Sequence, residues 1–157
     1  MDDLTVARAF HVLAIVHWIG GVAMVTTVIL PAIDRLAEAS ERLRMFEVIE
    51  GRFGRQARIS TAVAGLTGFY MTWRLSAFDR FLDPAFWWMH AMVGIWVIFT
   101  FVLFIAEPLF LHRWLRKRAA IDPDGTFRLV VRLHWFLLSL SLATLAGAVL
   151  GAHGALA

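Results

Sequence analysis

FWWMHAMVGIWVIFTFVLFIA, residues 86–106, carries no charged side chain. A helix that crosses a bilayer core needs about 20 mainly apolar residues, so this stretch has the length and composition of a membrane span. Three more stretches qualify, at roughly 5–32, 59–78 and 129–151. The whole chain is 60% hydrophobic with a mean hydropathy of +0.71, well above an ordinary soluble domain. The sequence therefore predicts an all-α integral membrane protein, a four-transmembrane-helix bundle that forms a single domain over residues 1–157.

Positive charge is divided unequally between the two sides that four spans would define. Of the fifteen lysines and arginines, only Arg8, Arg74 and Arg80 lie on the side of the termini. The other twelve lie on the opposite side, which the positive-inside rule assigns to the cytoplasm. We therefore expect a multi-pass protein of the bacterial cytoplasmic (inner) membrane with both termini outside, in the periplasm.

The first cytoplasmic loop is expected to contain an amphipathic helix. Its apolar residues recur at helical spacing with charged residues between them. They are Leu36, Leu43, Phe46, Ile49 and Phe53. Such a helix would lie on the membrane surface or extend the second span inward.

The composition also limits the partners. There is no cysteine, which excludes disulfides and thiolate metal sites. The net charge is +3, and the position of the basic residues in the cytoplasmic loops explains it. We therefore expect the partner to be a lipid bilayer and not a nucleic acid. Ala62, Gly65 and Gly68 would form an exposed small-residue face suited to a homodimer.

Two histidines within the expected spans give the main functional prediction. His11 and His90 would lie at similar depth near the outer face, on helices that run in the same direction. Ionisable residues inside spans usually mark a site, and paired histidines across a helix bundle are typical ligands of haem b. Trp18 shares the face of His11. Arg8 and Arg74 would neutralise the haem propionates.

Other histidines and methionines leave alternatives open. His17 and His134 could hold a second metal or serve only as hydrogen-bonding links between helices. Met92 and Met24, with Met71 and Met89, suggest a copper site instead of haem, because copper(I) accepts thioether and imidazole ligands. A third alternative is a structural or assembly factor without a cofactor. Glu107, before Pro108, is expected to pair with an arginine of the cytoplasmic side.

The segment Ala9-Phe10-His11-Val12-Leu13-Ala14, with Trp18, Gly21 and Leu30-Pro31 after it, resembles the first helix of the small HemJ-type protoporphyrinogen oxidases and of CopD-type membrane proteins. Trp88-Met89-His90-Ala91 is similar to the start of their third helix. The resemblance implies a haem b ligand at His11, and an oxidoreductase of the protoporphyrinogen-oxidase type. Met92 stands where the HemJ-type family has a lysine.

These observations together predict a haem b-binding membrane protein for electron transfer or a haem-dependent oxidation, exchanging electrons with a redox partner or a quinone. The alternative prediction is a copper-binding or copper-transport protein of the CopD type.

Overall fold

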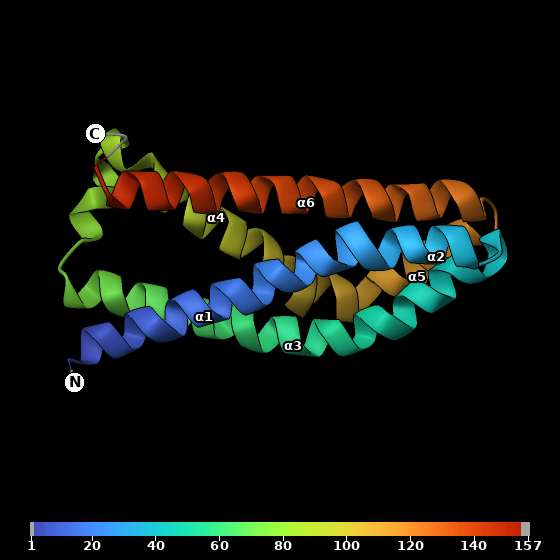
Figure 1. Cartoon of the computed structure of the whole chain (residues 1–157), viewed down its shortest axis with the longest axis horizontal. Helices are drawn as coiled ribbons and strands as arrows, with labels where there is room; N and C mark the ends of the chain where they lie inside the picture. Colours follow the sequence, from blue (N-terminus) through green and yellow to red (C-terminus); the bar gives the residue numbers. More distant parts are fainter. Residues whose placement is uncertain (1, 155–157) are drawn as a thin grey trace.

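The computed structural model describes residues 2–154, which form four long helical rods and no strand (Figure 1). The first rod joins α1 (Asp3–Met24), a π-helical segment (Val25–Ile29) and α2 (Leu30–Leu36). The second is α3 (Ala39–Arg74). The third joins α4 (Trp87–Phe101), a second π-helical segment (Val102–Leu111) and α5 (His112–Ala119). The fourth is α6 (Pro123–Ala152). Two short 3-10 turns (Phe78–Leu82, Pro84–Phe86) lie between α3 and α4, and the second of them leads directly into α4 and is counted with the third rod.

Local sequence explains where three rods begin. An aspartate precedes each of them, and its carboxylate accepts a hydrogen bond from a backbone N–H that the first turn leaves free. Asp2 accepts from Leu4, Asp83 from Ala85, and Asp122 from Gly125. Proline follows Asp83 and Asp122 directly, at the position where a helix loses nothing by its missing N–H.

Three of the observed rods contain the expected spans, and α3 contains the second span except for its last four residues. Three rods extend beyond the stretches 5–32, 86–106 and 129–151. α3 ends at Arg74, four residues before the expected end at 78, and the chain then turns through Ser76, whose φ is 49°. Polar and turn-forming residues therefore end this helix earlier than hydropathy alone indicated.

Three rods are long and apolar enough to cross a membrane: Asp3–Leu36, Pro84–Ala119 and Pro123–Ala152. α3 is long enough, but serine, threonine and glycine lower its hydropathy, so its crossing the bilayer stays a prediction. Large apolar side chains nevertheless point outward from all four rods. Examples are Leu13, Leu66, Phe101 and Phe136, which are 64%, 73%, 49% and 62% exposed. An exposed apolar surface of this extent is typical of contact with lipid.

The expected amphipathic helix is the N-terminal half of α3, so it continues directly into the second predicted span. Leu43 and Phe46 are buried against α2, α5 and the start of α6. Leu36 is 83% exposed at the end of α2 and takes no part in this packing. The sequence left open whether this helix lies separately on the membrane surface or extends the second predicted span. In the structure it is continuous with that span.

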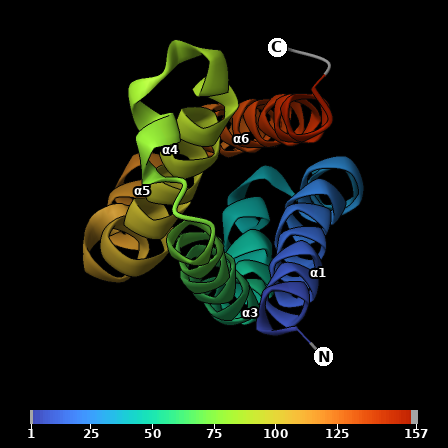
Figure 2. The ribbon, with the colours of Figure 1, turned by 90° about the vertical axis from the view of Figure 1, so that its left-hand side faces the viewer.

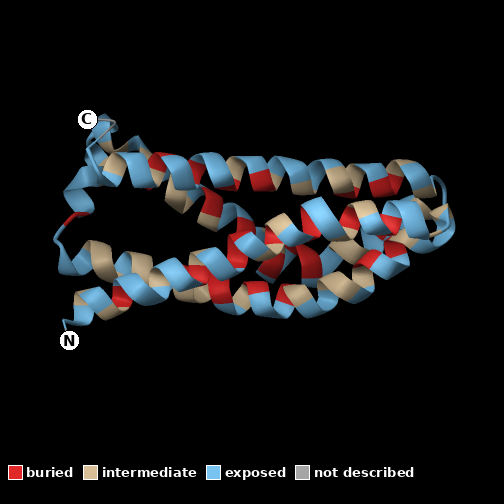
Figure 3. Ribbon diagram, viewed as in Figure 1, coloured by how far each residue is buried: buried red, intermediate tan, exposed pale blue. Residues whose placement is uncertain are grey.

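The rods pack unevenly along the molecule. Both termini and the 75–86 connection lie at one end, and the two short connections to α3 and α6 lie at the other (Figure 1). At the end with the termini, α1 packs mainly on α3 and α4 mainly on α6, so the rods form two pairs (Figure 2). Buried residues gather in the middle and toward the opposite end (Figure 3). The two pairs therefore separate toward the termini, where they leave room for a cavity.

Candidate functional site

A cavity of about 150 Å³ lies between the four rods in the half of the molecule that contains the termini. We call it the His11 cavity. Its lining extends from His11 to Ile19 on α1, about 12 Å at 1.5 Å per residue. The lining is almost entirely apolar, and His11 is its only ionisable member among the described residues. An apolar cavity with few polar groups is the usual form of a ligand site.

The His11 ring is held in one orientation by α3. Its Nδ1 lies 2.9 Å from the carbonyl oxygen of Ala64 and 3.0 Å from the hydroxyl of Thr67. A carbonyl oxygen can only accept, so Nδ1 carries the proton and donates it. Nε2 then holds a lone pair and has no hydrogen-bond partner within residues 2–154. A histidine with one nitrogen fixed to a backbone carbonyl and the other free is arranged as a metal ligand.

Two glycines of α3 make this arrangement possible. A Cβ at Gly68 would lie 3.0 Å from Cε1 of His11, and one at Gly65 would lie 2.5 Å from the Trp96 ring. Trp96 also donates from Nε1 to the carbonyl of Thr61 at 2.9 Å. The two glycines thus allow close contact of α3 with α1 and α4. The expectation that Gly65 and Gly68 form an exposed dimer face is wrong, because both face the interior of the same chain.

The structure does not bring His90 to His11. His90 is exposed, donates from Nε2 to the carbonyl of Phe81 at 3.0 Å, and does not line the His11 cavity. Its neighbours Met89 and Met92 line the cavity in its place, together with Met71 from α3. The cavity therefore combines one free imidazole nitrogen with three thioether side chains.

Arg8 and Arg74, the two arginines expected to neutralise haem propionates, have different surroundings. Arg74 forms an ion pair with Asp3 at 2.9 Å, and Tyr70 donates to the same carboxylate at 2.7 Å. These hydrogen bonds, that of Arg74 foremost, hold the pKa of Asp3 far below its usual range. Arg8 is exposed one turn before His11 and makes no ion pair within the described residues. Among the described residues Arg8 is thus a cation without an ion pair, one turn from His11.

Trp18 lines the cavity and is only 3% exposed. Its ring meets Phe99 edge-on, with 4.8 Å between the centroids. Its indole Nε1 is buried and has no hydrogen-bond partner in the described part of the chain. A buried donor without a partner is uncommon in a folded protein and is open to an acceptor on a ligand.

The second set of expected ligands is scattered. His17 is exposed on α1, and Met24 is 58% exposed. His134 is half-buried, contacts the Phe46 ring edge-on and is bonded through Nδ1 to the carbonyl of Val130 in its own helix. Met92 alone of this set lines the His11 cavity.

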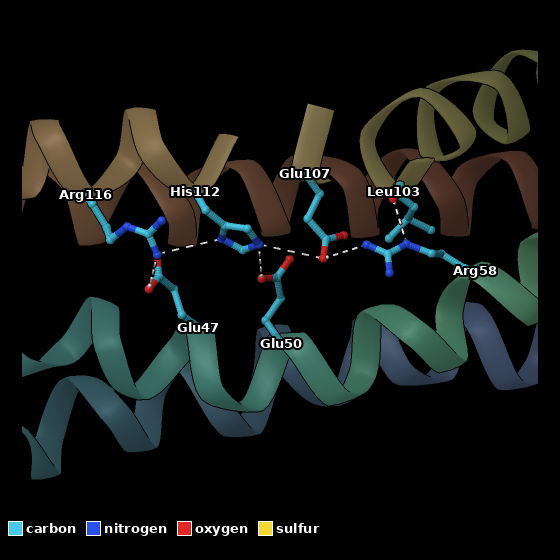
Figure 4. A network of polar contacts seen from close by, with 7 residues as sticks. All are labelled: Glu47, Glu50, Arg58, Leu103, Glu107, His112 and Arg116. Atoms are coloured by element: carbon cyan, nitrogen blue, oxygen red, sulfur yellow. Dashed lines mark hydrogen bonds and ion pairs between the residues drawn. The ribbon is translucent and has the colours of Figure 1, made fainter. Parts of the chain in front are cut away.

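A polar cluster lies nearer the other end of the molecule, between α3 and the third rod (Figure 4). We call Glu47, Glu50, Glu107 and His112 the Glu–His cluster. Nε2 of His112 lies 3.6 Å from Oε2 of Glu50 and 3.7 Å from Oε1 of Glu107, and Nδ1 lies 3.7 Å from Oε1 of Glu47. These distances exceed those of a hydrogen bond. The glutamates are largely buried, and the Glu107 side chain is only 5% exposed.

Two arginines border the Glu–His cluster. Arg58 contacts Oε1 of Glu107 at 3.0 Å and donates to the carbonyl of Leu103 at 2.8 Å, which confirms the expected ion pair of Glu107. Arg116 contacts Glu47 at 3.4 Å. Glu50 lies outside the expected span 59–78. Its burial, with the negative charges of Glu107 and Glu47, raises its pKa to about 7. Three buried carboxylates thus face two arginines and one imidazole.

The cluster was not predicted from the sequence, where His112, beside Arg113 and Arg116, was expected to be interfacial or solvated at the inner surface, and Glu107 was expected only to pair with an arginine. In a regular α-helix, residues five apart are separated by about 140° and do not share a face. Glu107 lies in the π-helical segment Val102–Leu111, where hydrogen bonds run from residue i to i+5 and residues five apart share one face. Pro108, which lacks an N–H, was the visible sign of an irregular helix here.

Comparison of the chain with protein families, with curated proteins and with solved structures found no match.

Proposed function

We propose that the chain is a multi-pass protein of the bacterial inner membrane that binds haem b through Nε2 of His11. The observation that carries the proposal is the His11 ring, which lines an apolar cavity between helices and is fixed through Nδ1, so that Nε2 has no hydrogen-bond partner among the described residues. Haem iron takes an axial histidine, and helix bundles commonly hold haem between facing helices.

Other residues of the cavity would complete the site. Met71, Met89 and Met92 offer thioethers for the second axial position, in place of the histidine pair expected from the sequence. Methionine side chains are flexible and would turn aside as the ring enters. Arg8 would neutralise a propionate, and Nε1 of Trp18 would donate to an oxygen of the ligand.

Haem in this position would supply one-electron transfer, and a quinone or another redox protein would be the partner. We favour electron transfer over porphyrinogen oxidation, because Met92 has no ionisable group where the HemJ-type family has a lysine. This resemblance is itself part of the proposal.

Copper(I) is the second candidate, favoured by the three methionines and one histidine that line the same cavity. Copper would be bound by the thioethers and the imidazole without any porphyrin. The same purified protein distinguishes the two: a haem protein is coloured, whereas a copper(I) protein is colourless and contains copper by elemental analysis.

We expect the His11→Ala variant, purified in detergent, to lose at least nine tenths of the haem absorption of the wild type. His90→Ala and His17→Ala serve as matched controls and should keep it, because both rings lie outside the cavity. Met89→Leu and Met92→Leu should lower the reduction potential if one of them is the second ligand, since methionine ligation raises it. The proposal would be contradicted if the wild-type protein contained no haem. It would also be contradicted if His90→Ala lost haem while His11→Ala kept it.

The membrane orientation is tested with two isosteric substitutions in this cysteine-free chain. Ser40→Cys lies at the start of α3 and Ser76→Cys in the connection to α4, at opposite ends of the molecule; both serines are exposed. A maleimide that cannot cross membranes should label Ser76→Cys in intact spheroplasts and Ser40→Cys only after lysis. The reverse pattern would place the termini in the cytoplasm, and equal labelling would show that α3 does not cross the membrane.

A further inference from the structure

The Glu–His cluster lies apart from the proposed haem site and has features that ordinary ion pairing does not explain. Glu107 is more than nine-tenths buried, and its Oε2 has no hydrogen-bond partner among the described residues. The same holds for Oε2 of Glu50, Oε1 of Glu47 and Nδ1 of His112. Buried polar atoms without partners are costly, so four of them in one cluster indicate a missing binding partner.

The geometry points to a divalent transition-metal ion, and we infer that Glu50, Glu107 and His112 bind one. One ligand atom from each of these residues lies within 4.8 Å of the other two. Nε2 of His112 lies 3.6 Å from Oε2 of Glu50 and 3.7 Å from Oε1 of Glu107, the oxygen that Arg58 also contacts; Oε2 of the same carboxylate has no partner among the described residues. Ligand atoms about 2.1 Å from a common tetrahedral ion lie about 3.4 Å apart, so small side-chain movements would complete the coordination.

The charges and ligand types agree with this assignment. Three carboxylates and two arginines leave one negative charge in excess in a largely buried place, which favours the binding of a cation. Imidazole together with carboxylates favours zinc, manganese or iron over calcium and magnesium, which prefer oxygen ligands alone. Three protein ligands leave a further coordination position for water or a substrate.

The surrounding residues support the ligands. Glu47 faces Nδ1 of His112, the position from which a carboxylate orients a metal-bound histidine. Arg58 holds Oε1 of Glu107 and leaves Oε2 free. Gly54 gives the Glu107 carboxylate room to approach α3, because a Cβ there would lie 3.0 Å from Oε1. The π-helical segment brings Glu107 and His112 to one face, and such segments are frequent at functional sites.

The test is Zn²⁺ binding to the full chain, without a polyhistidine tag and stripped with a chelator, followed by calorimetry and by thermal unfolding in detergent. We expect one Zn²⁺ per chain and a higher Tm with Zn²⁺. Glu50→Gln and His112→Ala should abolish saturable binding. Glu47→Gln should weaken it about 10- to 100-fold, as is typical for residues that orient a ligand. His153→Ala and His17→Ala, both exposed, are the control variants.

Glu50→Gln is the decisive variant, because it keeps the size of the side chain and should not destabilise the metal-free fold. Zn²⁺ bound equally by Glu50→Gln and wild type, or no saturable binding by wild type to Zn²⁺ or Mn²⁺, would overturn the inference. The cluster would then be a set of carboxyl groups that share protons. Zn²⁺ binding should survive in His11→Ala, so failure of the haem proposal and failure of this one can be told apart.

Discussion

Replacing Arg58 with methionine is expected to destabilise the metal-free protein by about 3 kcal/mol. Removal of one partner from a buried ion pair leaves the other charge uncompensated and typically costs about 3–5 kcal/mol. We expect the lower end of this range because the Arg58 side chain is 30% exposed, although Glu107 is only 5% exposed. The carbonyl of Leu103 loses its side-chain donor in the same variant.

Equilibrium unfolding in detergent measures this effect, and α3 provides a matched control. Arg44 pairs with Glu41 three residues away in the same helix, but Arg44 is 76% exposed. Arg44→Met should therefore cost less than about 1 kcal/mol. Adding Glu107→Gln to Arg58→Met should restore much of the lost stability, since it removes the uncompensated charge. Equal effects of Arg58→Met and Arg44→Met would show that the Arg58–Glu107 pair is not buried in solution.

The Glu50→Gln variant is expected to be more stable than wild type above pH 7, by up to about 3 kcal/mol in the metal-free protein. The pKa of Glu50 rises from 4.5 to about 7 on folding, and each unit corresponds to about 1.4 kcal/mol. Below about pH 4.5 the carboxyl is protonated in both the folded and the unfolded state. As the pH rises toward 7, the unfolded carboxyl ionises first, so the free energy of unfolding of wild type decreases.

The measurement is the free energy of unfolding between pH 4 and pH 8, in the presence of a chelator. The groups that face Glu50 are Glu47, Glu107, His112 and Arg58, and they are unchanged in the variant. The difference between variant and wild type should grow across this range and level off above pH 7. A difference that stays constant from pH 4 to pH 8 would mean that Glu50 has an ordinary pKa in the folded protein.

The helices could be predicted from the sequence because they depend on local features. Runs of apolar residues gave the positions of the rods, and the third and fourth begin at an Asp-Pro pair. The place of His11 beside the cavity followed from its face on α1, shared with Trp18. That α3 crosses the bilayer stays a prediction, because serine, threonine and glycine in its second half lower its hydropathy and it is not among the three rods apolar enough to span.

The partners of each helix face could not be predicted, because they depend on packing between rods. Met89, His90 and Met92 lie within one turn of α4, and periodicity does not tell which of them faces His11. The structure turns the two methionines inward and His90 outward. The Glu–His cluster was missed for a different reason: a period of 3.6 residues does not apply across the π-helical segment before His112.

The π-helical segment Val102–Leu111 has a consequence for how the chain can vary in length. The same rod presents Met89 and Met92 to one cavity and Glu107 with His112 to another site, and the extra residue of the wide turns sets the rotation between them. Deletion of one residue between 102 and 106 would rotate the two ends by about 100° against each other. No rigid rotation of the rod could then satisfy both sites. A length change at this point would therefore be compatible with only one of the two sites.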